Sequence, residues 1–369
     1  MIGVLGGGQL GRMFSLEASK LGYRVHVFEP EKDCPAGQVS DLEINASFAD
    51  AAALGRFAGG VDVATYEFEN IPLAALEIVG RSVPVRPRGE ALHICQHRER
   101  EKNFLAANNI PCTRFWVVDS VGTLGSALEE LNGRGVLKTA SFGYDGKGQL
   151  RVKSGDDAEA IWAAFGNTRA VLEALVDFTH ELSIVCARDL DGNVTLFPAS
   201  ENRHTNHILD FSIVPARIPE SALAGARAIA TRVAETLDVV GLITTEFFLT
   251  LDGRVLVNEL APRPHNSGHF SLDACMTSQF EQQVRAICGL PPGSTELLRP
   301  VVMLNLLGDL WKSGEPDWSA VLCDPNVKLH LYGKREARPG RKMGHLCVLA
   351  DTVDDALARA EAIKARLGT

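Results

Sequence analysis

The chain has 369 residues, of which 46% are hydrophobic and 22% are charged, a balance typical of soluble globular proteins with two or three domains. The formal net charge of −9 argues against a nucleic-acid-binding protein, which needs a basic face, but it is compatible with a local basic pocket for anionic metabolites. The eight cysteines are scattered, without a Cys-x-x-Cys pair or zinc spacing, and no apolar run is long enough to span a membrane. We therefore expect a cytoplasmic protein with reduced thiols and no signal peptide.

Residues 1–90 alternate short apolar strands with helical stretches. The pattern predicts strands at residues 2–5, 24–28 and 61–65 and helices at residues 10–21 and 73–79. Such alternation is typical of a parallel, doubly wound βα domain.

A glycine-rich turn follows the first strand. Residues 6–11 fit the spacing G-x-G-x-x-G, and Glu29 lies where a dinucleotide site would place its ribose-binding acid. However, Gln9 and Arg12 are polar where a dinucleotide fold packs its backbone closely, and no hydride-transfer site follows, so an NAD-dependent dehydrogenase is a distant alternative. We predict instead that the turn holds part of another substrate, because glycine turns at helix N-termini bind many anions.

Two acids follow the strand at residues 61–65. Glu67 and Glu69 lie just past its carboxyl end, where sheets of this kind bind ligands. We predict that both line the same cleft as the glycine turn; the alternative is that they are solvated loop acids.

A glycine-rich loop at residues 141–149 follows a predicted strand at residues 135–139. Lys138 lies near the end of that strand, and Lys147 lies at the tip of the loop. Free backbone N–H groups and a lysine can wrap phosphate oxygens, so we predict a nucleotide flap. The alternative is an ordinary hairpin turn at Asp145-Gly146. Before this loop, residues 91–108 are predicted as one helix that carries Arg98 and Lys102 one turn apart.

A predicted hairpin brings two carboxylates together. Asp252-Gly253 is a two-residue turn that would pair Leu251 with Arg254 and, counting outward, Glu246 with Glu259. Two carboxylates suit Mg²⁺, a hard cation that usually shares its oxygen ligands with nucleotide phosphates. The alternative is that both are surface charges of the hairpin.

The segment at residues 258–269, Asn-Glu-Leu-Ala-Pro-Arg-Pro-His-Asn-Ser-Gly-His, continues directly from this pair. Its two prolines limit how far the backbone can move. We predict that its basic and polar side chains hold a second, anionic reactant next to the nucleotide phosphates, which is the outline of an ATP-dependent ligase.

The last segment, residues 294–369, is predicted as a small α+β module with strands at 301–307, 328–332 and 345–350 and a helix at 352–367. Five basic residues gather in its loop: Lys334, Arg335, Arg338, Arg341 and Lys342. In an acidic protein we interpret this cluster as a phosphate clamp that faces the glycine turn; the alternative is a solvated basic loop.

Five motifs, in the right order over essentially the whole chain, resemble the N5-carboxyaminoimidazole ribonucleotide synthetase family of the ATP-grasp superfamily. They lie at residues 6–13, 66–70, 143–149, 258–269 and 341–345. The departures are small: Phe270 stands where tryptophan is common, and Thr244-Thr245 is more polar than usual. The resemblance implies an ATP-grasp fold with an N-terminal doubly wound parallel βα domain (1–97), an ATP-grasp domain (98–290) and a C-terminal α+β module (291–369), and it implies a homodimer.

The resemblance also implies an activity: carboxylation of 5-aminoimidazole ribonucleotide with ATP, Mg²⁺ and bicarbonate through carboxyphosphate, in purine biosynthesis. The nearest alternative is another ATP-grasp ligase, such as the formate-dependent glycinamide ribonucleotide transformylase. The implied ATP-binding residues are Arg98, Lys138, Gly143, Tyr144, Asp145, Gly146, Lys147, Gly148, Gln149, Glu173, Ala174, Leu175, Val176, Glu181, His204, Asn258 and Glu259.

The implied metal ligands are Glu246 and Glu259, and the implied catalytic residues are Arg263, His265, Asn266 and Ser267. His265 is also a candidate acceptor for the proton of the substrate amine. The implied contacts of the nucleotide substrate are Gln9, Leu10, Glu67, Tyr144, Lys147, Lys334 and Arg341.

Overall fold

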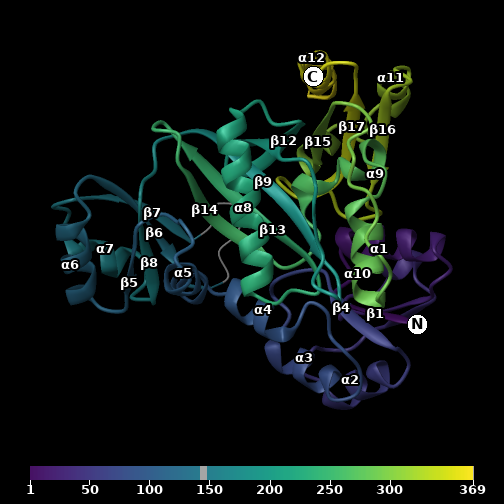
Figure 1. The fold of residues 1–369 in the computed structure, drawn as a ribbon, viewed down its shortest axis with the longest axis horizontal. Coiled ribbons are helices and arrows are strands. Elements are labelled where there is room, and N and C mark those ends of the chain that lie inside the picture. The colour runs from purple at the N-terminus through teal and green to yellow at the C-terminus, as the bar shows by residue number, and fades with distance from the viewer. Residues whose placement is uncertain (142–147, 369) are drawn as a thin grey trace.

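The computed structural model describes residues 1–141 and 148–368, in which three β-sheets organise the fold (Figure 1). The first sheet is wholly parallel, with strand order β3 (Leu42–Ile44), β2 (Val25–Phe28), β1 (Ile2–Leu5) and β4 (Val63–Tyr66). Helix α1 (Gln9–Lys20) packs on one face together with α10 (Gln279–Cys288), whereas α2 (Ala51–Ala58) and α3 (Leu73–Gly80) cover the other. The predicted doubly wound parallel domain is confirmed.

A small antiparallel sheet lies at the opposite side of the molecule, at the left of Figure 1. Its strand order is β5 (Phe115–Val118), β8 (Ala170–Ala174), β6 (Arg134–Thr139) and β7 (Gln149–Lys153). Helices α6 (Val121–Glu130) and α7 (Ala158–Ala164) bury their apolar sides against it and form a core of its own.

The single helix predicted at residues 91–108 is wrong, because the chain forms two helices, α4 (Gly89–Cys95) and α5 (Arg98–Ala107). His97 breaks the helix with an extended backbone (φ −136°, ψ 111°). The break lets the Arg98 N–H donate to the carbonyl of Ala140, 2.8 Å away at the end of β6. Arg98 therefore starts α5 close to the strand that carries Lys138.

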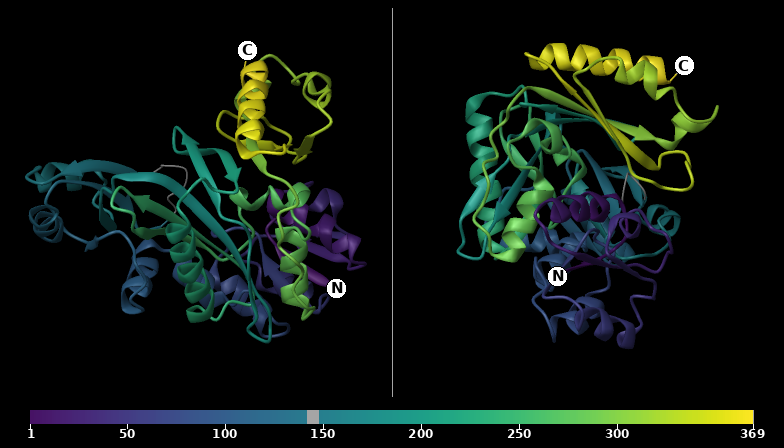
Figure 2. Two further views of the ribbon diagram at one scale, coloured as in Figure 1. Left: turned by 45° about the horizontal axis from the view of Figure 1, so that its top comes forward. Right: turned by 90° about the vertical axis from the view of Figure 1, so that its right-hand side faces the viewer.

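The third sheet has nine strands and runs through the centre of the molecule into its C-terminal part (Figure 2). Its strand order is β14 (Val255–Ala261), β13 (Gly241–Thr250), β9 (Phe178–Arg188), β11 (Ser200–Thr205), β12 (Ile208–Val214), β15 (Val301–Leu307), β17 (Lys342–Leu349) and β16 (Val327–Leu331), with β10 (Val194–Leu196) beside β9. The C-terminal strands thus extend the central sheet through the β12–β15 pairing.

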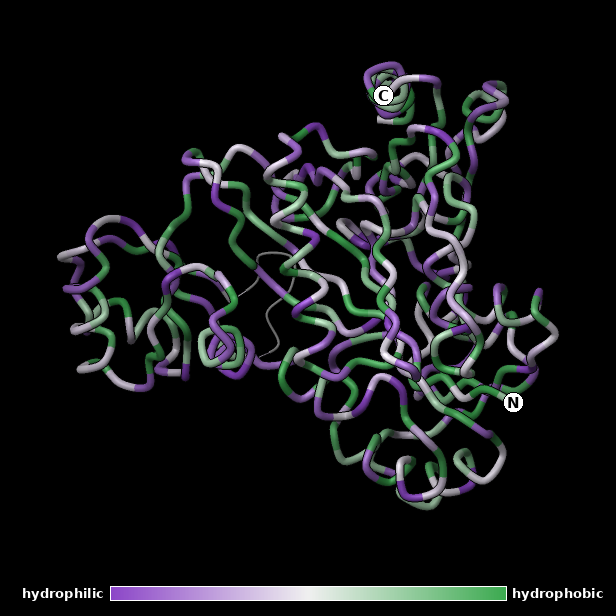
Figure 3. The backbone as a smooth tube through the Cα atoms, viewed as in Figure 1, coloured by the Kyte–Doolittle hydropathy of each residue, from purple (hydrophilic) through white to green (hydrophobic). Residues whose placement is uncertain are grey.

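Two long helices cover this sheet, α8 (Glu220–Thr236) over its first strands and α12 (Val353–Leu367) over its last. Short helical turns occupy the remaining connections: η1 (Gly37–Val39), η2 (Asn266–Gly268), α9 (Ser271–Ala274), η3 (Gly308–Trp311) and α11 (Trp318–Leu322). The buried core consists mainly of apolar residues from the sheet strands and the helices that cover them. Figure 3 shows how hydrophobic and hydrophilic residues are distributed along the backbone. No helix in the described parts of the chain has the length and apolarity that a membrane crossing needs.

The carboxylate hairpin confirms one predicted pairing and corrects another. Glu246 lies directly opposite Glu259, as predicted. However, the turn has three residues, because the Thr250 N–H donates to Arg254 O at 2.9 Å, so the predicted pair of Leu251 with Arg254 is wrong.

A β-bulge at Asn258 restores the register beyond the turn. Val257 and Leu260 both belong to the core, whereas Asn258 and Glu259 between them both point away from it. Without the extra residue, Asn258 would stand opposite Glu246 and Glu259 would turn to the other face of the sheet.

Candidate active site

A row of polar side chains crosses four strands of the central sheet. Glu259 on β14 opposes Glu246 on β13, Glu246 opposes Ser183 on β9, and Ser183 opposes Ser200 on β11. Directly opposed residues of antiparallel strands point to the same face, so the row lies on one surface. The loop that contains η2 lies against β9, β11 and β12.

The two glutamates concentrate negative charge at the end of this row. Burial and the like charge of Glu259 raise the pKa of Glu246 to about 7. A divalent cation would relieve this repulsion, and the donors are carboxylate oxygens of the kind that Mg²⁺ prefers. Among residues 1–141 and 148–368, no three His, Cys, Asp or Glu side chains form a group that could hold a metal ion. Two protein carboxylates suffice where phosphate oxygens complete the coordination.

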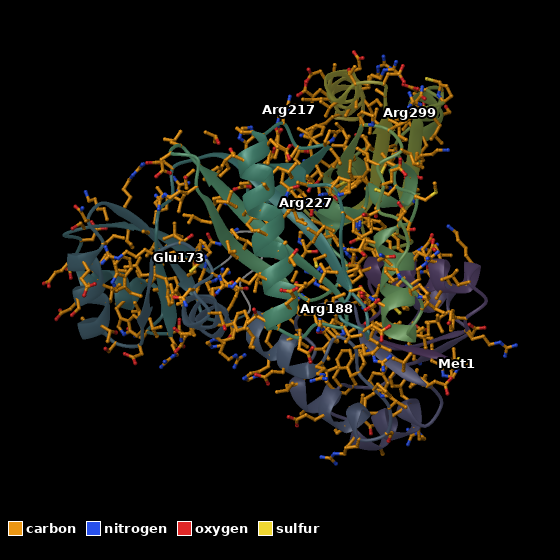
Figure 4. The ribbon with its side chains drawn as sticks, viewed as in Figure 1. Met1, Glu173, Arg188, Arg217, Arg227 and Arg299 are labelled. Atoms are coloured by element: carbon orange, nitrogen blue, oxygen red, sulfur yellow. The ribbon has the colours of Figure 1, made fainter. Side chains whose placement is uncertain are left out.

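Cations face the glutamates from the small antiparallel sheet and α5. Arg98 lies 3.9 Å from Glu259 and 3.8 Å from Glu173, and Lys138 lies 3.1 Å from Glu173. Burial alone would raise the pKa of Glu173, but Lys102, Lys138 and Arg98 together lower it to about 2. Glu173, labelled in Figure 4, is therefore an internal counter-ion of the predicted phosphate-binding cations.

Lys102 is a functional candidate that the sequence did not single out beyond its spacing from Arg98. Its side chain is fully buried, and its Nζ donates to the carbonyl of Asn258 at 2.9 Å. One residue before it, Glu101 accepts a hydrogen bond from the Leu260 N–H at 3.0 Å. Helix α5 thus holds both sides of Glu259, and the bulge leaves the Asn258 carbonyl free for the lysine.

The loop after β14 brings Arg263 and His265 beside the glutamates. Arg263 pairs with Glu69, so Glu69 lies beside this loop. His265 Nε2 lies 3.2 Å from Glu246 Oε1, and burial with nearby positive charge holds the pKa of this imidazole well below its usual value. Both side-chain polar atoms of Asn266 are buried and have no hydrogen-bond partner among the described residues. An unpaired buried amide is costly, which suits a residue whose partner is a bound reactant.

Ser267 and His269, from the same loop, are completely buried. The Ser267 hydroxyl contacts Ser183 and His265, and His269 packs among Phe280, Tyr332 and His345. The structure therefore places Ser267 behind His265, and His269 in the packed interior.

The glycine turn, which was predicted to hold part of a substrate, donates its backbone N–H groups to carboxylates of the protein itself. Glu67 accepts hydrogen bonds from the N–H groups of Gly8 (2.7 Å) and Gly11 (3.1 Å), and Glu29 accepts one from Gly7 (2.8 Å). The protein's own carboxylates thus occupy the anion site at the start of α1, which removes the basis for a dinucleotide pyrophosphate there.

Two predicted substrate contacts, Gln9 and Leu10, follow the glycine turn and differ in exposure. Leu10 buries its side chain in the core beside α10, whereas Gln9 stays partly exposed.

The basic loop of the C-terminal part faces the glycine turn, as predicted. Gln38 donates to the Gly333 carbonyl at 3.0 Å, and Arg335 pairs with Asp33 at 2.7 Å. Lys334 is largely buried, and burial together with nearby Arg341 lowers its pKa to about 8.

The five basic residues of that loop are not equivalent. Arg335 and Arg338 form exposed ion pairs with Asp33 and Glu336. Arg341 donates to the carbonyl of Glu336, and the charge of Lys342 acts on Glu246 and His265. Lys342 is therefore a second site residue that sequence reasoning missed, although it lies inside the predicted cluster.

The predicted nucleotide residues lie along the edge between the small and central sheets. Ala174 ends β8, and Leu175 and Val176 follow it as partly buried residues. Glu181 pairs with His204. Burial alone would lower the pKa of this histidine, but the hydrogen bond and the negative charges of Glu181 and Glu246 together raise it.

The predicted flap lies mostly outside the described residues, including Gly143, Tyr144, Asp145, Gly146 and Lys147. Of its remainder, Gly148 adopts φ +68°, and a Cβ there would lie 2.6 Å from the Thr139 hydroxyl. Gln149 pairs with Lys138 at the start of β7.

Three protein-family models match successive parts of the chain. Residues 1–96 match the ribonucleotide synthetase preATP-grasp domain, residues 103–280 match the ATP-grasp domain, and residues 301–359 match the phosphoribosylaminoimidazole carboxylase C-terminal domain.

The chain is similar over nearly its full length to N5-carboxyaminoimidazole ribonucleotide synthases. It is 46% identical to that of Brucella melitensis (94% of this chain, 95% of the relative) and 44% identical to that of Bacillus subtilis (96% and 93%). An ADP complex of such a synthetase superposes with a TM-score of 0.93 at 43% identity, covering 98% of this chain and 96% of the other. The Aspergillus clavatus enzyme with ADP and 5-aminoimidazole ribonucleotide superposes with a TM-score of 0.90 at 31% identity (99% and 98%). The expected fold is thereby confirmed, and the chain belongs to the N5-carboxyaminoimidazole ribonucleotide synthase family of ATP-grasp ligases.

Proposed function

We propose that this cleft uses ATP and bicarbonate to carboxylate 5-aminoimidazole ribonucleotide on its exocyclic amine, giving N5-carboxyaminoimidazole ribonucleotide, ADP and phosphate in purine biosynthesis. The observation that carries the proposal is the pair of opposed carboxylates, Glu246 and Glu259, which has phosphate-binding cations on one side and the His265 loop on the other. The ligands named for the Aspergillus clavatus neighbour, ADP and the aminoimidazole nucleotide, support the same pair of substrates here.

We assign Glu246 and Glu259 as the magnesium ligands, with Asn258 beside them. Bound Mg²⁺ would neutralise charge on the transferred phosphoryl group. The raised pKa of Glu246 supports this assignment, because two carboxylates that repel each other in the free protein are stabilised by a shared cation.

Arg98 and Lys138 would hold the ATP phosphates. In the free protein they share the buried carboxylate of Glu173, so phosphate binding adds a second anion to a cluster that already carries three cations with Lys102. The backbone of residues 173–176 would bind the adenine edge, Glu181 with His204 would face the ribose, and residues 143–149 would close over the phosphates.

Arg263, His265 and Asn266 would hold bicarbonate and then carboxyphosphate. A bicarbonate oxygen attacks the γ-phosphorus and ADP leaves; the substrate amine then attacks the carboxyl carbon and phosphate leaves. Bicarbonate has a hydroxyl that can donate a hydrogen bond and oxygens that can accept one. The unpaired amide of Asn266 can therefore both accept from it and donate to it. Water must be excluded while carboxyphosphate exists, which a closing loop serves.

The phosphate of the aminoimidazole nucleotide would be held by Lys334 and Arg341. Partly buried Lys334 lies within electrostatic range of Glu67, which supports a binding site between the basic loop and the glycine turn. Because carboxylates fill the glycine turn, the substrate phosphate belongs with the lysine, and Glu67 and Gln9 would contact the sugar or base. We further propose a cytoplasmic homodimer.

Parallel measurement of ADP and of carboxylated nucleotide tests the function. We expect one product per ADP, and we expect ADP release to require both bicarbonate and aminoimidazole ribonucleotide. ADP release that instead depends on formate and glycinamide ribonucleotide would overturn the proposal in favour of the transformylase alternative.

A further inference from the structure

His265 is fixed through its backbone by a buried glutamine at the start of α10. The Gln279 Oε1 accepts from the His265 N–H at 2.9 Å, and its Nε2 donates to the His265 carbonyl at 2.8 Å. A Cβ added to Gly268 would lie 2.6 Å from the same Oε1, so the loop is tightly closed around this side chain. Two opposed hydrogen bonds to one residue leave its backbone little freedom.

The imidazole ring of His265 is fixed through Nδ1. The Ser267 N–H points at this nitrogen from 3.3 Å, and the Ser267 hydroxyl lies 2.8 Å from it. A backbone N–H can only donate, so this contact favours Nδ1 as an acceptor, as in other helical turns that a side chain caps. The single proton of the neutral ring is then on Nε2.

A buried chain of hydrogen bonds on the central sheet leads to Ser267, and its donors also point toward His265 Nδ1. Ser212 donates to Asn202 Oδ1 (2.9 Å), Asn202 Nδ2 donates to Ser183 Oγ (2.9 Å), and Ser183 donates to Ser267 Oγ (2.6 Å). Because Ser267 already accepts from Ser183, its own proton is directed to His265 Nδ1. Cross-strand pairing aligns Ser212 with Asn202, and the members on β9, β11 and β12 are all buried.

We infer that this relay makes the Nε2–H of His265 a fixed hydrogen-bond donor to the reacting carboxyl oxygens, and that Ser183 and Asn202 are the positioning residues that set it. The Nε2 end points toward the cleft, 3.2 Å from Glu246 Oε1. A ring with Nδ1 occupied and Nε2 protonated cannot take the proton of the substrate amine. That proton instead leaves with the phosphate: the amine nitrogen forms the bond to the carboxyl carbon, the bond from carbon to the phosphate oxygen breaks, and hydrogen phosphate departs.

The inference deepens the proposed function and rests on it for the identity of the reactant, but the proton position can be measured without any substrate. ¹⁵N NMR of the full chain labelled at histidine reports which ring nitrogen carries the proton, and loss of a signal in His265→Gln identifies the residue. We expect the proton of the parent protein on Nε2. A proton on Nδ1 overturns the inference, whereas failure of the proposed function would show separately as no carboxylated product from the parent enzyme.

Asn202→Asp reverses the relay with almost no change of shape. A carboxylate only accepts, so Ser183 would donate to it and Ser267 would donate to Ser183. The Ser267 hydroxyl, 2.8 Å from His265 Nδ1, would then favour a proton on that nitrogen over the longer 3.3 Å contact from the Ser267 N–H. We expect the proton to move to Nδ1 and carboxylation to fall roughly 10- to 100-fold, the usual effect of losing an outer partner of a reacting group, with less product per ADP.

Ser183→Ala and Thr244→Val complete the test. Ser183→Ala breaks the relay without adding charge. We expect a mixture of His265 rings protonated on Nε2 and on Nδ1, and a smaller loss of carboxylated product per ADP than in Asn202→Asp. This variant tests the relay if circular dichroism shows that Asn202→Asp does not fold. Thr244 is a buried hydroxyl two residues from Glu246 with no partner among the described residues, so Thr244→Val should retain the parental ring form and product ratio. A folded relay variant with both parental properties would overturn the role of the relay.

Discussion

Replacing Glu173 by glutamine should destabilise the free protein by several kilocalories per mole. The carboxylate lies among Arg98, Lys102 and Lys138, and all four groups are largely or fully buried. The glutamine keeps the shape of the side chain but leaves three cations without their shared anion. Removing one partner of a buried charge cluster usually costs about 3–5 kcal/mol, because the other charges stay desolvated.

The pKa of Glu173 gives an independent magnitude for the same change. The folded value is about 2 and the ordinary value is 4.5, a difference of about 2.5 units. At about 1.4 kcal/mol per unit, the ionised carboxylate contributes about 3 kcal/mol to the free energy of unfolding at pH 7. Since the folded pKa is depressed, this contribution is fully present above pH 4.5 and is lost as the pH falls toward 2. By the same linkage relation it is about 2 kcal/mol at pH 3.5.

Urea unfolding of the parent and Glu173→Gln proteins at pH 7 and at pH 3.5 measures both numbers. Glu130→Gln is a matched control on the same small sheet region, because Glu130 forms an exposed pair with Arg114 and such pairs contribute about 0–1 kcal/mol. We also expect ATP to stabilise Glu173→Gln more than the parent, since its phosphates replace the missing anion. If the unfolding free energies of Glu173→Gln and the parent agree within about 0.5 kcal/mol at pH 7, the counter-ion role of Glu173 is refuted.

Four further predictions concern the reactants. Glu259→Gln should abolish ADP formation with an unchanged circular dichroism spectrum, and near-parental turnover at saturating Mg²⁺ would contradict the metal assignment. Lys334→Ala should raise the KM for aminoimidazole ribonucleotide roughly ten- to a hundredfold and the KM for ATP far less, because a charge-assisted hydrogen bond contributes about 1.5–3 kcal/mol. Since the pKa of Lys334 is lowered to about 8, the KM for the same nucleotide should rise as the pH increases through that value, and a flat KM profile from pH 7 to 9 would argue against the lysine. His265→Ala should bind ATP normally but release ADP with little carboxylated product, and a retained ratio of one product per ADP at the parental rate would remove this histidine from the mechanism.

The parallel domain and the carboxylate pair could be predicted because their signals are local. Residues 1–90 alternate between strands and helices, and Glu246 and Glu259 are separated in the sequence by a single turn. Both features can be predicted without knowing which distant segments are in contact. The strand β11 was missed because its sequence is Ser-Glu-Asn-Arg-His-Thr. Its inward residues are polar members of the site, so they break the apolar alternation of a half-buried strand.

Contacts between distant segments explain the remaining differences. Lys102 and Asn258 are 156 residues apart, and nothing near either residue predicts that they meet. The glycine turn has the spacing of an anion site, but its occupant, Glu67, lies 59 residues beyond Gly8. A motif indicates which backbone geometry forms, whereas the fold decides which group fills it.

The bulge at Asn258 has an evolutionary consequence. A hairpin with a two-residue turn and no bulge would also place Glu246 opposite Glu259. The same pair of ligands could therefore evolve with either kind of hairpin. Only the bulged kind leaves the Asn258 carbonyl unpaired within the sheet and available to Lys102. Without this carbonyl, the buried lysine would keep only the carboxylate of Glu173, 3.5 Å away, and would lose its shorter contact at 2.9 Å. Across relatives, the length of this surface turn and the residue that corresponds to Lys102 should therefore change together, although the turn and the lysine are not in contact.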